Sequence, residues 1–168
     1  MSDTNNPLDR FKITKADESH YDDIIALIKS PDELFLIYPA GNWPFDRSQL
    51  QSLALQRSDL TVVLDARHVI GFANIYRNNS GDKFFIGNVV ISEACRGKGL
   101  GRRLVQHMCD LIFDHYASTV HISVFNFNTK ALLLYTKLGF RPYEIELHTM
   151  PNGDNAALIH MRLDSRNW

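Results

Sequence analysis

The sequence predicts a single domain that combines helices with strands, and three observations carry this prediction. The chain has 168 residues, of which 45% are apolar and 22% are charged, as expected for one globular domain with a sizeable core. Apolar residues recur at helical spacing in some segments and follow a β-strand pattern in others. The two kinds of segment follow one another without an internal repeat or a break in composition. We therefore expect one mixed α/β domain over residues 10–168.

The N-terminal part should begin with a flexible polar tail over residues 1–9, followed by a short strand over residues 11–14. A helix is expected next, capped by Asp17 or Ser19 and ended by Pro31. Its buried face is predicted from apolar residues that share the i, i+3, i+4, i+7 spacing, namely Tyr21, Ile24, Ile25 and Ile28.

Residues 31–45 are predicted to form an irregular loop, because prolines and a glycine recur there among several aromatic residues. Loops of this length often carry function. A helix should begin after Asp46, since Asp46 and Gln49 have the spacing of a capping box. Phe45 and Leu50 occupy the positions of a hydrophobic staple on either side of that start.

The rest of the chain alternates between strand and helix patterns. Gly87 lies inside the third strand of an antiparallel meander and is expected to mark a β-bulge. The predicted strands span residues 60–64, 69–76, 83–91, 119–125, 143–148 and 156–163. The predicted helices span residues 46–57, 100–116 and 129–138.

Charge and cysteine content exclude several classes of function. The net charge is −1, so we expect neither nucleic acid nor an anionic membrane as a partner. The N-terminus lacks the basic and apolar regions of a signal peptide, and no later run is long enough to span a bilayer. Cys95 and Cys109 make neither a disulfide framework nor a zinc cluster. These features predict a cytoplasmic protein without a metal ion.

The glycine loop, residues 91–103, leads from a strand into an amphipathic helix and is the most informative segment. Glycines at positions 97, 99 and 101 let the backbone approach a ligand closely. Amides at a helix N-terminus lack intrahelical partners and lie at the positive end of the helix dipole. Further positive charge comes from Arg96, Lys98, Arg102 and Arg103. The loop therefore predicts an anion site suited to phosphate.

Spacing separates three phosphate-binding motifs that compete for this loop. Arg102 stands where the dinucleotide motif has its third glycine, and no Gly-Lys-Ser/Thr of a Walker loop is present. The remaining pattern, Arg-Gly-x-Gly-x-Gly from Arg96 to Gly101, resembles the pyrophosphate loop of the GCN5-related N-acetyltransferases (GNAT family). Taken alone, the loop also fits a protein that binds a nucleotide without coenzyme A.

A second motif follows in residues 124–140, which match the same family's pattern Val-x-x-x-Asn-x-x-Ala-x-x-x-Tyr-x-x-x-Gly-Phe at every fixed position. Asn128 and Tyr135 are seven residues apart, so they lie on one face of a helix and can face a common ligand. Each also has a structural interpretation, because Asn128 can cap the helix and Tyr135 can belong to the core.

Two motifs in the family's order make the resemblance strong, and it extends in outline over residues 10–165. It implies a single-domain GNAT fold with a twisted mixed sheet of roughly six to seven strands and about four helices. In this family the sheet splays between its fourth and fifth strands, here residues 83–91 and 119–125. The pantetheine arm of acetyl-CoA, the cosubstrate, would lie there.

The resemblance also implies roles for individual residues. The backbone of Val89, Val90 and Ile91 would pair with pantetheine and point an amide at the thioester carbonyl. Asn128 would contact the pantetheine arm, and Tyr135 would be the general acid for the departing thiolate. The pyrophosphate would be held by Arg96, Gly97, Lys98, Gly99, Leu100, Gly101 and Arg102.

The base that deprotonates the acceptor amine stays open. Family members that acetylate ribosomal protein N-termini carry a glutamate five residues before the motif asparagine, and this chain has Ser123 there. Other candidates, none of which is preferred, are Glu33, Tyr38, His121, Glu144, Glu146 and His148.

The expected function is acetyl transfer from acetyl-CoA to a primary amine of a small molecule or peptide, by direct attack on the thioester. The missing base favours an alternative, a non-catalytic domain that binds acyl-CoA as a sensor or interaction module. The partners expected are acetyl-CoA and an amine acceptor, and the chain is expected to be a monomer or a homodimer.

Overall fold

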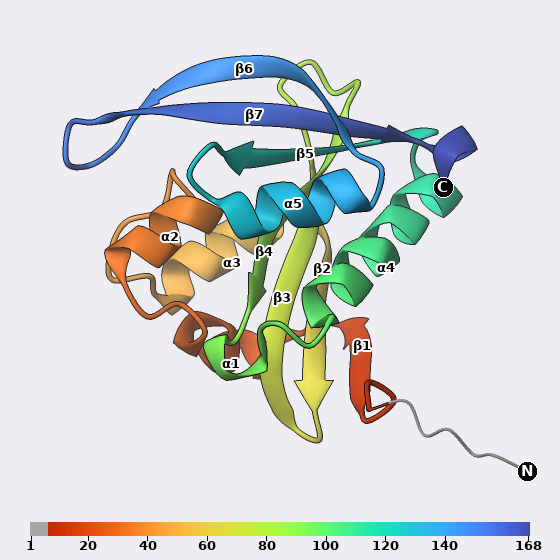
Figure 1. The fold of residues 1–168 in the computed structure, drawn as a ribbon. Coiled ribbons are helices and arrows are strands. Elements are labelled where there is room, and N and C mark those ends of the chain that lie inside the picture. The colour runs from red at the N-terminus through yellow and green to blue at the C-terminus, as the bar shows by residue number, and fades with distance from the viewer. Residues whose placement is uncertain (1–6) are drawn as a thin grey trace, which may run out of the picture. The chain divides into compact units, whose positions relative to one another are not determined.

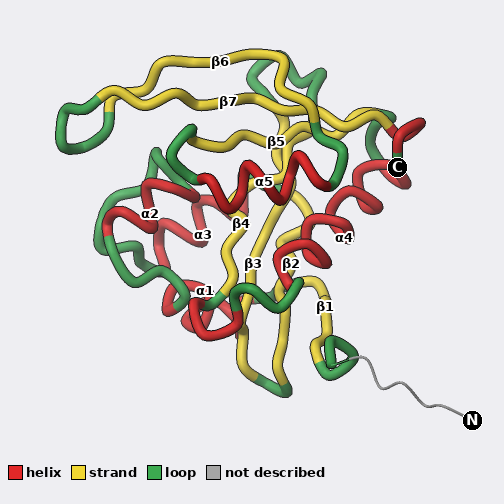
Figure 2. Tube along the Cα trace, in the orientation of Figure 1, coloured by secondary structure: helices red, strands yellow, loops and turns green. Residues whose placement is uncertain are grey.

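The computed structural model describes residues 7–168, which form a mixed α/β fold of five α-helices and seven strands (Figures 1 and 2). The prediction of a mixed α/β fold is confirmed. The sheet order is β1-β2-β3-β4-β5-β7-β6. The strands are β1 (Phe11–Lys15), β2 (Ser58–Asp65), β3 (His68–Arg77), β4 (Phe84–Ile91), β5 (Thr119–Phe125), β6 (Arg141–Thr149) and β7 (Asn155–Asp164). The helices are α1 (Tyr21–Ala26), α2 (Pro31–Ile37), α3 (Arg47–Gln56), α4 (Leu100–His115) and α5 (Thr129–Lys137).

The chain divides into two compact units, which we describe separately. The first unit comprises the residues up to Asn74 together with Asn88–Val105. The second unit comprises Ile75–Gly87 and Gln106–Trp168. The predicted tail falls partly outside the described residues, because positions 1–6 are not among them. Residues 7–10 form a turn in which the carbonyl of Leu8 accepts a hydrogen bond from Arg103.

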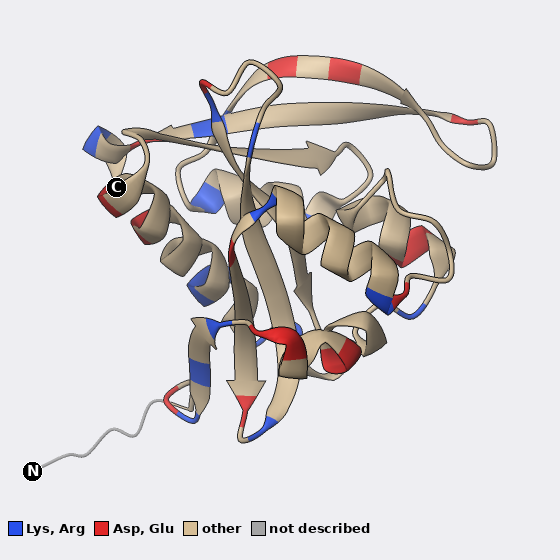
Figure 3. Cartoon of the chain, turned by 180° about the vertical axis from the view of Figure 1, so that it is seen from behind, with Lys and Arg blue, Asp and Glu red and all other residues tan. Residues whose placement is uncertain are grey.

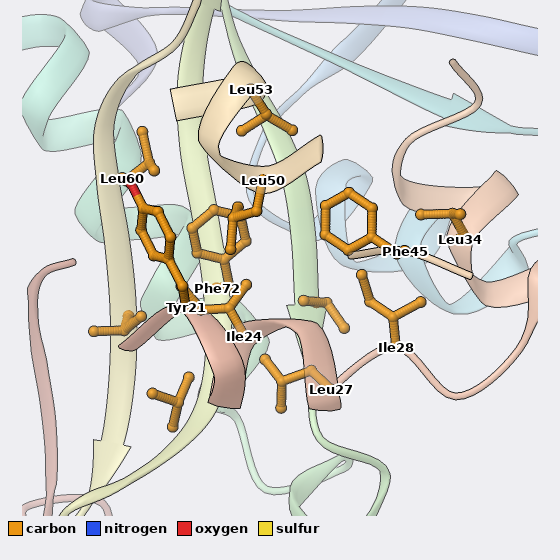
Figure 4. Close-up of a cluster of buried hydrophobic side chains, with 13 residues drawn as sticks. Tyr21, Ile24, Leu27, Ile28, Leu34, Phe45, Leu50, Leu53, Leu60 and Phe72 are labelled. Atoms are coloured by element: carbon orange, nitrogen blue, oxygen red, sulfur yellow. The ribbon is translucent and has the colours of Figure 1, made fainter. Parts of the chain in front are cut away.

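The core of the first unit lies between its strands and the helices α1, α2 and α3 (Figure 4). Ile24 and Leu50 are completely buried in this cluster. Phe72 reaches it from β3, and Leu60 reaches it from β2. Full burial of one such side chain contributes about 1.5–3 kcal/mol. This packing explains why apolar residues at helical spacing in α1 and α3 form helices here.

Helix α2 corrects the prediction of an irregular loop over residues 31–45. Pro31 begins this helix, and the Ser30 hydroxyl accepts a hydrogen bond from the Glu33 amide (3.2 Å). Proline at the first helical position loses no hydrogen bond, because that amide would have no partner in a helix. The preceding helix ends earlier than expected, at Ala26, after a 3-10 turn over Glu18–His20 that Asp17 caps.

The predicted start of α3 is confirmed. The Asp46 carboxylate accepts a hydrogen bond from the Gln49 amide (2.9 Å), and both staple residues, Phe45 and Leu50, are buried. The Gln49 side chain does not complete the capping box in the structure. Its amide group instead binds the backbone of Asn42 through an oxygen and a nitrogen (2.8 and 2.9 Å).

The second unit is built on β5, β7 and β6, which pair as antiparallel neighbours, with α5 running alongside β5 (Figure 1). The pairing of β4 with β5 is parallel and joins Phe84–Ile86 to Val120–Ile122. None of the helices in residues 7–168 combines the length and the apolar character needed to cross a bilayer.

Candidate functional site

The glycine loop leaves β4, passes through a 3-10 turn over Glu93–Cys95 and enters α4. Gly97 (φ 75°) and Gly99 (φ 84°) adopt left-handed conformations that side chains with a Cβ rarely take. A Cβ at Gly97 would meet nothing within 4 Å, so backbone conformation rather than crowding requires this glycine. The predicted glycine pattern therefore encodes the shape of the loop.

The start of α4 leaves backbone amides without intrahelical acceptors, which is the arrangement that the predicted anion site requires. The first helical hydrogen bond joins the Arg103 amide to the Gly99 carbonyl (3.1 Å), so the amides of residues 100–102 precede any intrahelical acceptor. Leu100 points its side chain into the core, with 1% exposed, and can offer a ligand only its backbone. Arg102 is exposed at this end of the helix.

The other basic side chains of the loop are engaged with the protein itself. Arg96 donates to the Ile91 carbonyl (2.9 Å) and forms an ion pair with Glu33 (3.3 Å). Lys98 donates to the Ala94 carbonyl (3.0 Å). The positive charge predicted from sequence is present, but Glu33 compensates part of it.

A cavity of about 550 Å³ lies against this loop in the first unit, and the sequence did not predict it. Its charged and polar lining comes from α1, the segment after it, the start of α2, the start of β3 and the residues that follow β4: Asp23, Lys29, Glu33, His68, Ser92, Glu93 and Arg96. Both signs of charge face the cavity, so it is suited to a zwitterionic or hydrogen-bonding group rather than to a simple anion.

The residue of β4 with a left-handed backbone is Asn88, which follows the Gly87 at which a β-bulge is predicted. Asn88 has φ 52° and is buried. Its side-chain oxygen accepts a hydrogen bond from the Asn74 amide (2.7 Å), and its own amide donates to the Ile37 carbonyl at the end of α2 (2.8 Å). Asparagine tolerates the left-handed region better than other residues with a Cβ. This network places Val89, Val90 and Ile91 directly after a fixed backbone bend.

In the second unit, Asn128 and Tyr135 both show the structural roles that were considered for them. The Asn128 side chain caps α5 by accepting a hydrogen bond from the Ala131 amide (3.3 Å). Tyr135 is buried, with its ring 6.0 Å from that of Phe140. Burial raises the pKa of the Tyr135 phenol, so it stays protonated at neutral pH and can donate a proton but cannot act as a base.

Comparison with known proteins identifies the family. Residues 23–140 match the family described as Acetyltransferase (GNAT) family. This match covers well over half of the chain. The chain belongs to the GNAT family.

Among related proteins, the mycothiol acetyltransferase of Jonesia denitrificans is 28% identical over 96 residues, 56% of this chain and 31% of that protein. The chain spans about a third of the length of the curated relatives that it matches. A GCN5-related N-acetyltransferase from Kribbella flavida has a TM-score of 0.77 and 23% identity, covering 92% of this chain and 98% of that one. A Salmonella typhimurium protein solved with its cofactor acetyl-CoA has a TM-score of 0.71 and 19% identity, covering 92% and 94%. These structures confirm the expected GNAT fold.

The candidate bases of this GNAT chain differ sharply in environment. Glu33 is paired with Arg96, and Tyr38 packs edge-on against Phe45 at 6.1 Å. His121 is buried against Tyr143, whose hydroxyl lies 3.1 Å from its Nδ1. Burial, aided by the charges of Lys83 and Arg162, lowers the pKa of His121 to about 4. His121 is therefore neutral near pH 7 but a weak base.

The remaining candidates lie on β6, and one of them joins a side chain that sequence reasoning missed. Glu146 accepts hydrogen bonds through its two oxygens from His148 (3.0 Å) and from His160 of β7 (3.1 Å). His160 in turn contacts Ser123 of β5 (2.7 Å). The exposed carboxylate of Glu144 lies opposite His160 in the register of β6 and β7. The sequence signal for His160 was its place in the predicted strand over residues 156–163. The sequence did not show which strands would pair with that strand.

The cysteines give no sign of nucleophilic chemistry. Cys109 is buried in α4, and burial raises the pKa of its thiol to about 12. Such a thiol is almost entirely protonated at neutral pH and is a poor nucleophile. Cys95, in the turn before the loop glycines, is a free and partly exposed cysteine.

Proposed function

We propose that this chain is an N-acetyltransferase that uses acetyl-CoA to acetylate a primary amine of a small molecule or a peptide. The observation that carries the proposal is the glycine loop. Gly97 and Gly99 in left-handed conformations lead into a 16-residue helix whose first amides have no intrahelical partner. Membership of the GNAT family and the fold shared with a protein solved with acetyl-CoA support this cosubstrate.

The pyrophosphate of acetyl-CoA is assigned to the loop, where backbone amides do most of the binding. Arg102 supplies an exposed positive charge. Arg96 and Lys98 instead stabilise the loop by donating hydrogen bonds to its backbone carbonyls. The complete set of proposed pyrophosphate residues is Arg96, Gly97, Lys98, Gly99, Leu100, Gly101 and Arg102. The backbone of Val89, Val90 and Ile91 is assigned to pantetheine and to the thioester carbonyl.

Acetyl-CoA supplies an acetyl group that is activated as a thioester. An alkylammonium has a pKa near about 10 and must lose a proton before its nitrogen can attack. Tyr135 is assigned as the general acid for the departing thiolate, because its raised pKa keeps the phenol protonated. Asn128 is assigned to the pantetheine arm through its side-chain nitrogen, since its oxygen caps α5.

The acidic residues of β6 favour a cationic acceptor. Glu144 and Glu146, the acidic residues of β6, are exposed. Figure 3 shows acidic residues in red along this strand. Carboxylates attract an ammonium group and raise its local concentration, more so at low ionic strength. We therefore place polyamines, aminoglycosides and peptide N-termini ahead of neutral acceptors.

The test is a thiol-release assay with acetyl-CoA over a panel of polyamines, aminoglycosides, amino acids and peptide N-termini. The expected result is thiol release that depends on one class of amine, together with thermal stabilisation by coenzyme A. Stabilisation by coenzyme A without thiol release from any amine would favour the alternative, a non-catalytic acyl-CoA sensor. Stabilisation by nucleotides that lack the pantetheine arm, equal to that by coenzyme A, would favour a nucleotide-binding protein. The cytoplasmic location and the choice between monomer and homodimer stay predictions.

A further inference from the structure

Three side chains on neighbouring strands of the second unit form one hydrogen-bonded chain, which we call the Ser–His–Glu chain: Ser123, His160 and Glu146. Ser123 of β5 lies directly opposite His160 of β7, with 2.7 Å between the serine Oγ and the histidine Nδ1. The other ring nitrogen, Nε2, lies 3.1 Å from Oε2 of Glu146 on β6. Both ring nitrogens of His160 therefore have partners.

The chemistry of these groups determines which atoms of the Ser–His–Glu chain carry protons. An ionised carboxylate can only accept a hydrogen bond, so the proton on the His160 ring belongs at Nε2. The Nδ1 atom is then an acceptor, and the Ser123 hydroxyl donates to it. Hydrogen bonding from His160 lowers the pKa of Glu146, which keeps the carboxylate ionised. A neutral His160 in this orientation is a base at Nδ1, and the proton that it takes up comes from the Ser123 hydroxyl.

The Ser–His–Glu chain also connects a partly buried oxygen, Ser123 Oγ, with solvent. Ser123 follows Ile122, the last residue of β5 in the parallel pairing with β4. Ser123 is partly buried, the His160 side chain is 15% exposed, and the Glu146 side chain is 55% exposed. A proton taken up at the serine therefore has a short route to an exposed carboxylate.

The surroundings of His160 contain both charged and neutral groups. On the neighbouring strands, Phe85 presents its ring edge-on at 6.2 Å and Tyr143 lies at 6.2 Å between ring centroids. The titratable and charged groups near His160 on β5, β6 and β7 are His121, Tyr143, Glu144, Glu146, His148 and Arg162. Glu146 is the carboxylate that directly contacts the His160 ring.

We propose that the Ser–His–Glu chain is the proton relay that deprotonates the acceptor ammonium, a proposal that rests on the proposed acetyltransferase function. The ammonium N–H proton passes to Ser123 Oγ as the serine's own proton passes to His160 Nδ1. The freed nitrogen lone pair forms the C–N bond, the C–S bond breaks, and the thiolate takes a proton from Tyr135. The attacking nitrogen loses its second proton to solvent as the neutral amide forms. The imidazolium, held by Glu146, then returns its proton to solvent, and the Tyr135 phenol is reprotonated from solvent.

The relay predicts a pH-dependent loss of rate in the variant His160→Gln. With the best amine from the panel, His160→Gln should lower kcat/KM about 100-fold near pH 7, because a positioned base contributes at least this much. The loss should shrink as the pH approaches the pKa of the amine, since the free amine needs no base there. Thermal stabilisation by coenzyme A should be unchanged, because the relay does not bind it.

Matched controls separate the relay from a structural role. His115→Gln changes an exposed histidine in the same unit and should keep kcat/KM within about twofold of the wild type. The double variant Ser123→Ala/His160→Gln should be no slower than His160→Gln alone, because both residues belong to one pathway. A variant that merely destabilises the sheet would instead lose rate equally at every pH.

Two results would overturn the relay while leaving the acetyltransferase function in place. One is an active wild-type protein with His160→Gln equally active across the pH range. The other is an acetyl group found by mass spectrometry on Ser123 after incubation with acetyl-CoA alone, because the serine would then be a nucleophile. Absence of thiol release by the wild type with every amine would overturn the relay and the proposed function together.

Discussion

Burial sets the protonation state of two titratable side chains in this GNAT protein, Tyr135 and His121. The pKa of the Tyr135 phenol is raised and that of the His121 imidazole is lowered to about 4, in both cases mainly because the charged form would lose its hydration. Both groups are thus neutral near pH 7, so the Tyr135 phenol keeps its proton and His121 is a packed, uncharged ring. Ser123 and His160, which are only partly buried, keep the access to solvent that proton transfer needs.

Replacing Tyr135 with phenylalanine should lower kcat about 100-fold, because the change removes the proposed acid and leaves the ring in place. The dissociation constant for coenzyme A, measured by titration calorimetry, should stay within about twofold of the wild type, since no proposed cofactor contact uses the hydroxyl. Tyr116→Phe, at an exposed tyrosine of the same unit, is the control. A rise in the dissociation constant with kcat unchanged would assign Tyr135 to binding rather than to proton transfer.

His121 should make the protein less stable as the pH falls. Its pKa is about 4 in the folded protein and 6.5 ordinarily, so below pH 6.5 the unfolded chain takes up a proton that the folded chain does not. The free energy of unfolding should therefore decrease between pH 6.5 and about 4 and be unaffected by this group above pH 6.5. Denaturant titrations of the wild type and His121→Gln at pH 7 and pH 4.5 should show a smaller loss for the variant. Equal losses would mean that His121 is not the group responsible.

At the scale of elements, the glycine loop and the start of α4 form one feature, because the loop enters the helix through left-handed glycines and the first helix amides have no intrahelical partner. Helix α2 and strand β4 form a second feature of this kind, since the Asn88 side chain of β4 is hydrogen-bonded to the end of the helix. The glycine loop could be predicted from the sequence, because its glycines recur at every second position from 97 to 101. The link between α2 and β4 could not be predicted, because it depends on a contact between residues 51 positions apart.

A pair of substitutions at Gly99 separates the charge of the loop from its shape. Both Gly99→Asn and Gly99→Asp place a side chain of similar size at φ 84°, which asparagine and aspartate tolerate comparatively well. Gly99→Asp also adds a negative charge beside the proposed pyrophosphate position. We expect Gly99→Asp to weaken coenzyme A binding about tenfold more than Gly99→Asn, with the difference shrinking at high salt.

Titration calorimetry at low and high ionic strength measures this difference. Equal affinities of the two variants at low salt would show that the loop does not contact the phosphates of coenzyme A. Thermal denaturation of both variants without ligand checks that the loop still supports the fold.

At the scale of the whole molecule, stability depends on cores that draw side chains from distant parts of the chain. Leu50 of α3 is completely buried with residues from α1, α2, β2 and β3. Leu50→Ala should lower the free energy of unfolding by about 2–5 kcal/mol, as expected for a cavity in a packed core. Leu55→Ala on the same helix removes a side chain that is 89% exposed and should cost less than about 0.5 kcal/mol. Urea denaturation of the two variants provides the comparison, and similar losses would contradict the packing described here.

The sequence by itself determined the strands, helices α3, α4 and α5, the glycine loop and the two GNAT motifs, because these depend on periodicity, caps and spacing within short segments. Tertiary structure alone decided that Pro31 begins a helix, that Asn88 of β4 has a left-handed backbone, and that Arg96 forms an ion pair with Glu33. It also decided that His160 meets Ser123 and Glu146. A cross-strand contact depends on which strands become neighbours and in which register, and that choice is made by the burial of the whole sheet rather than by any local pattern.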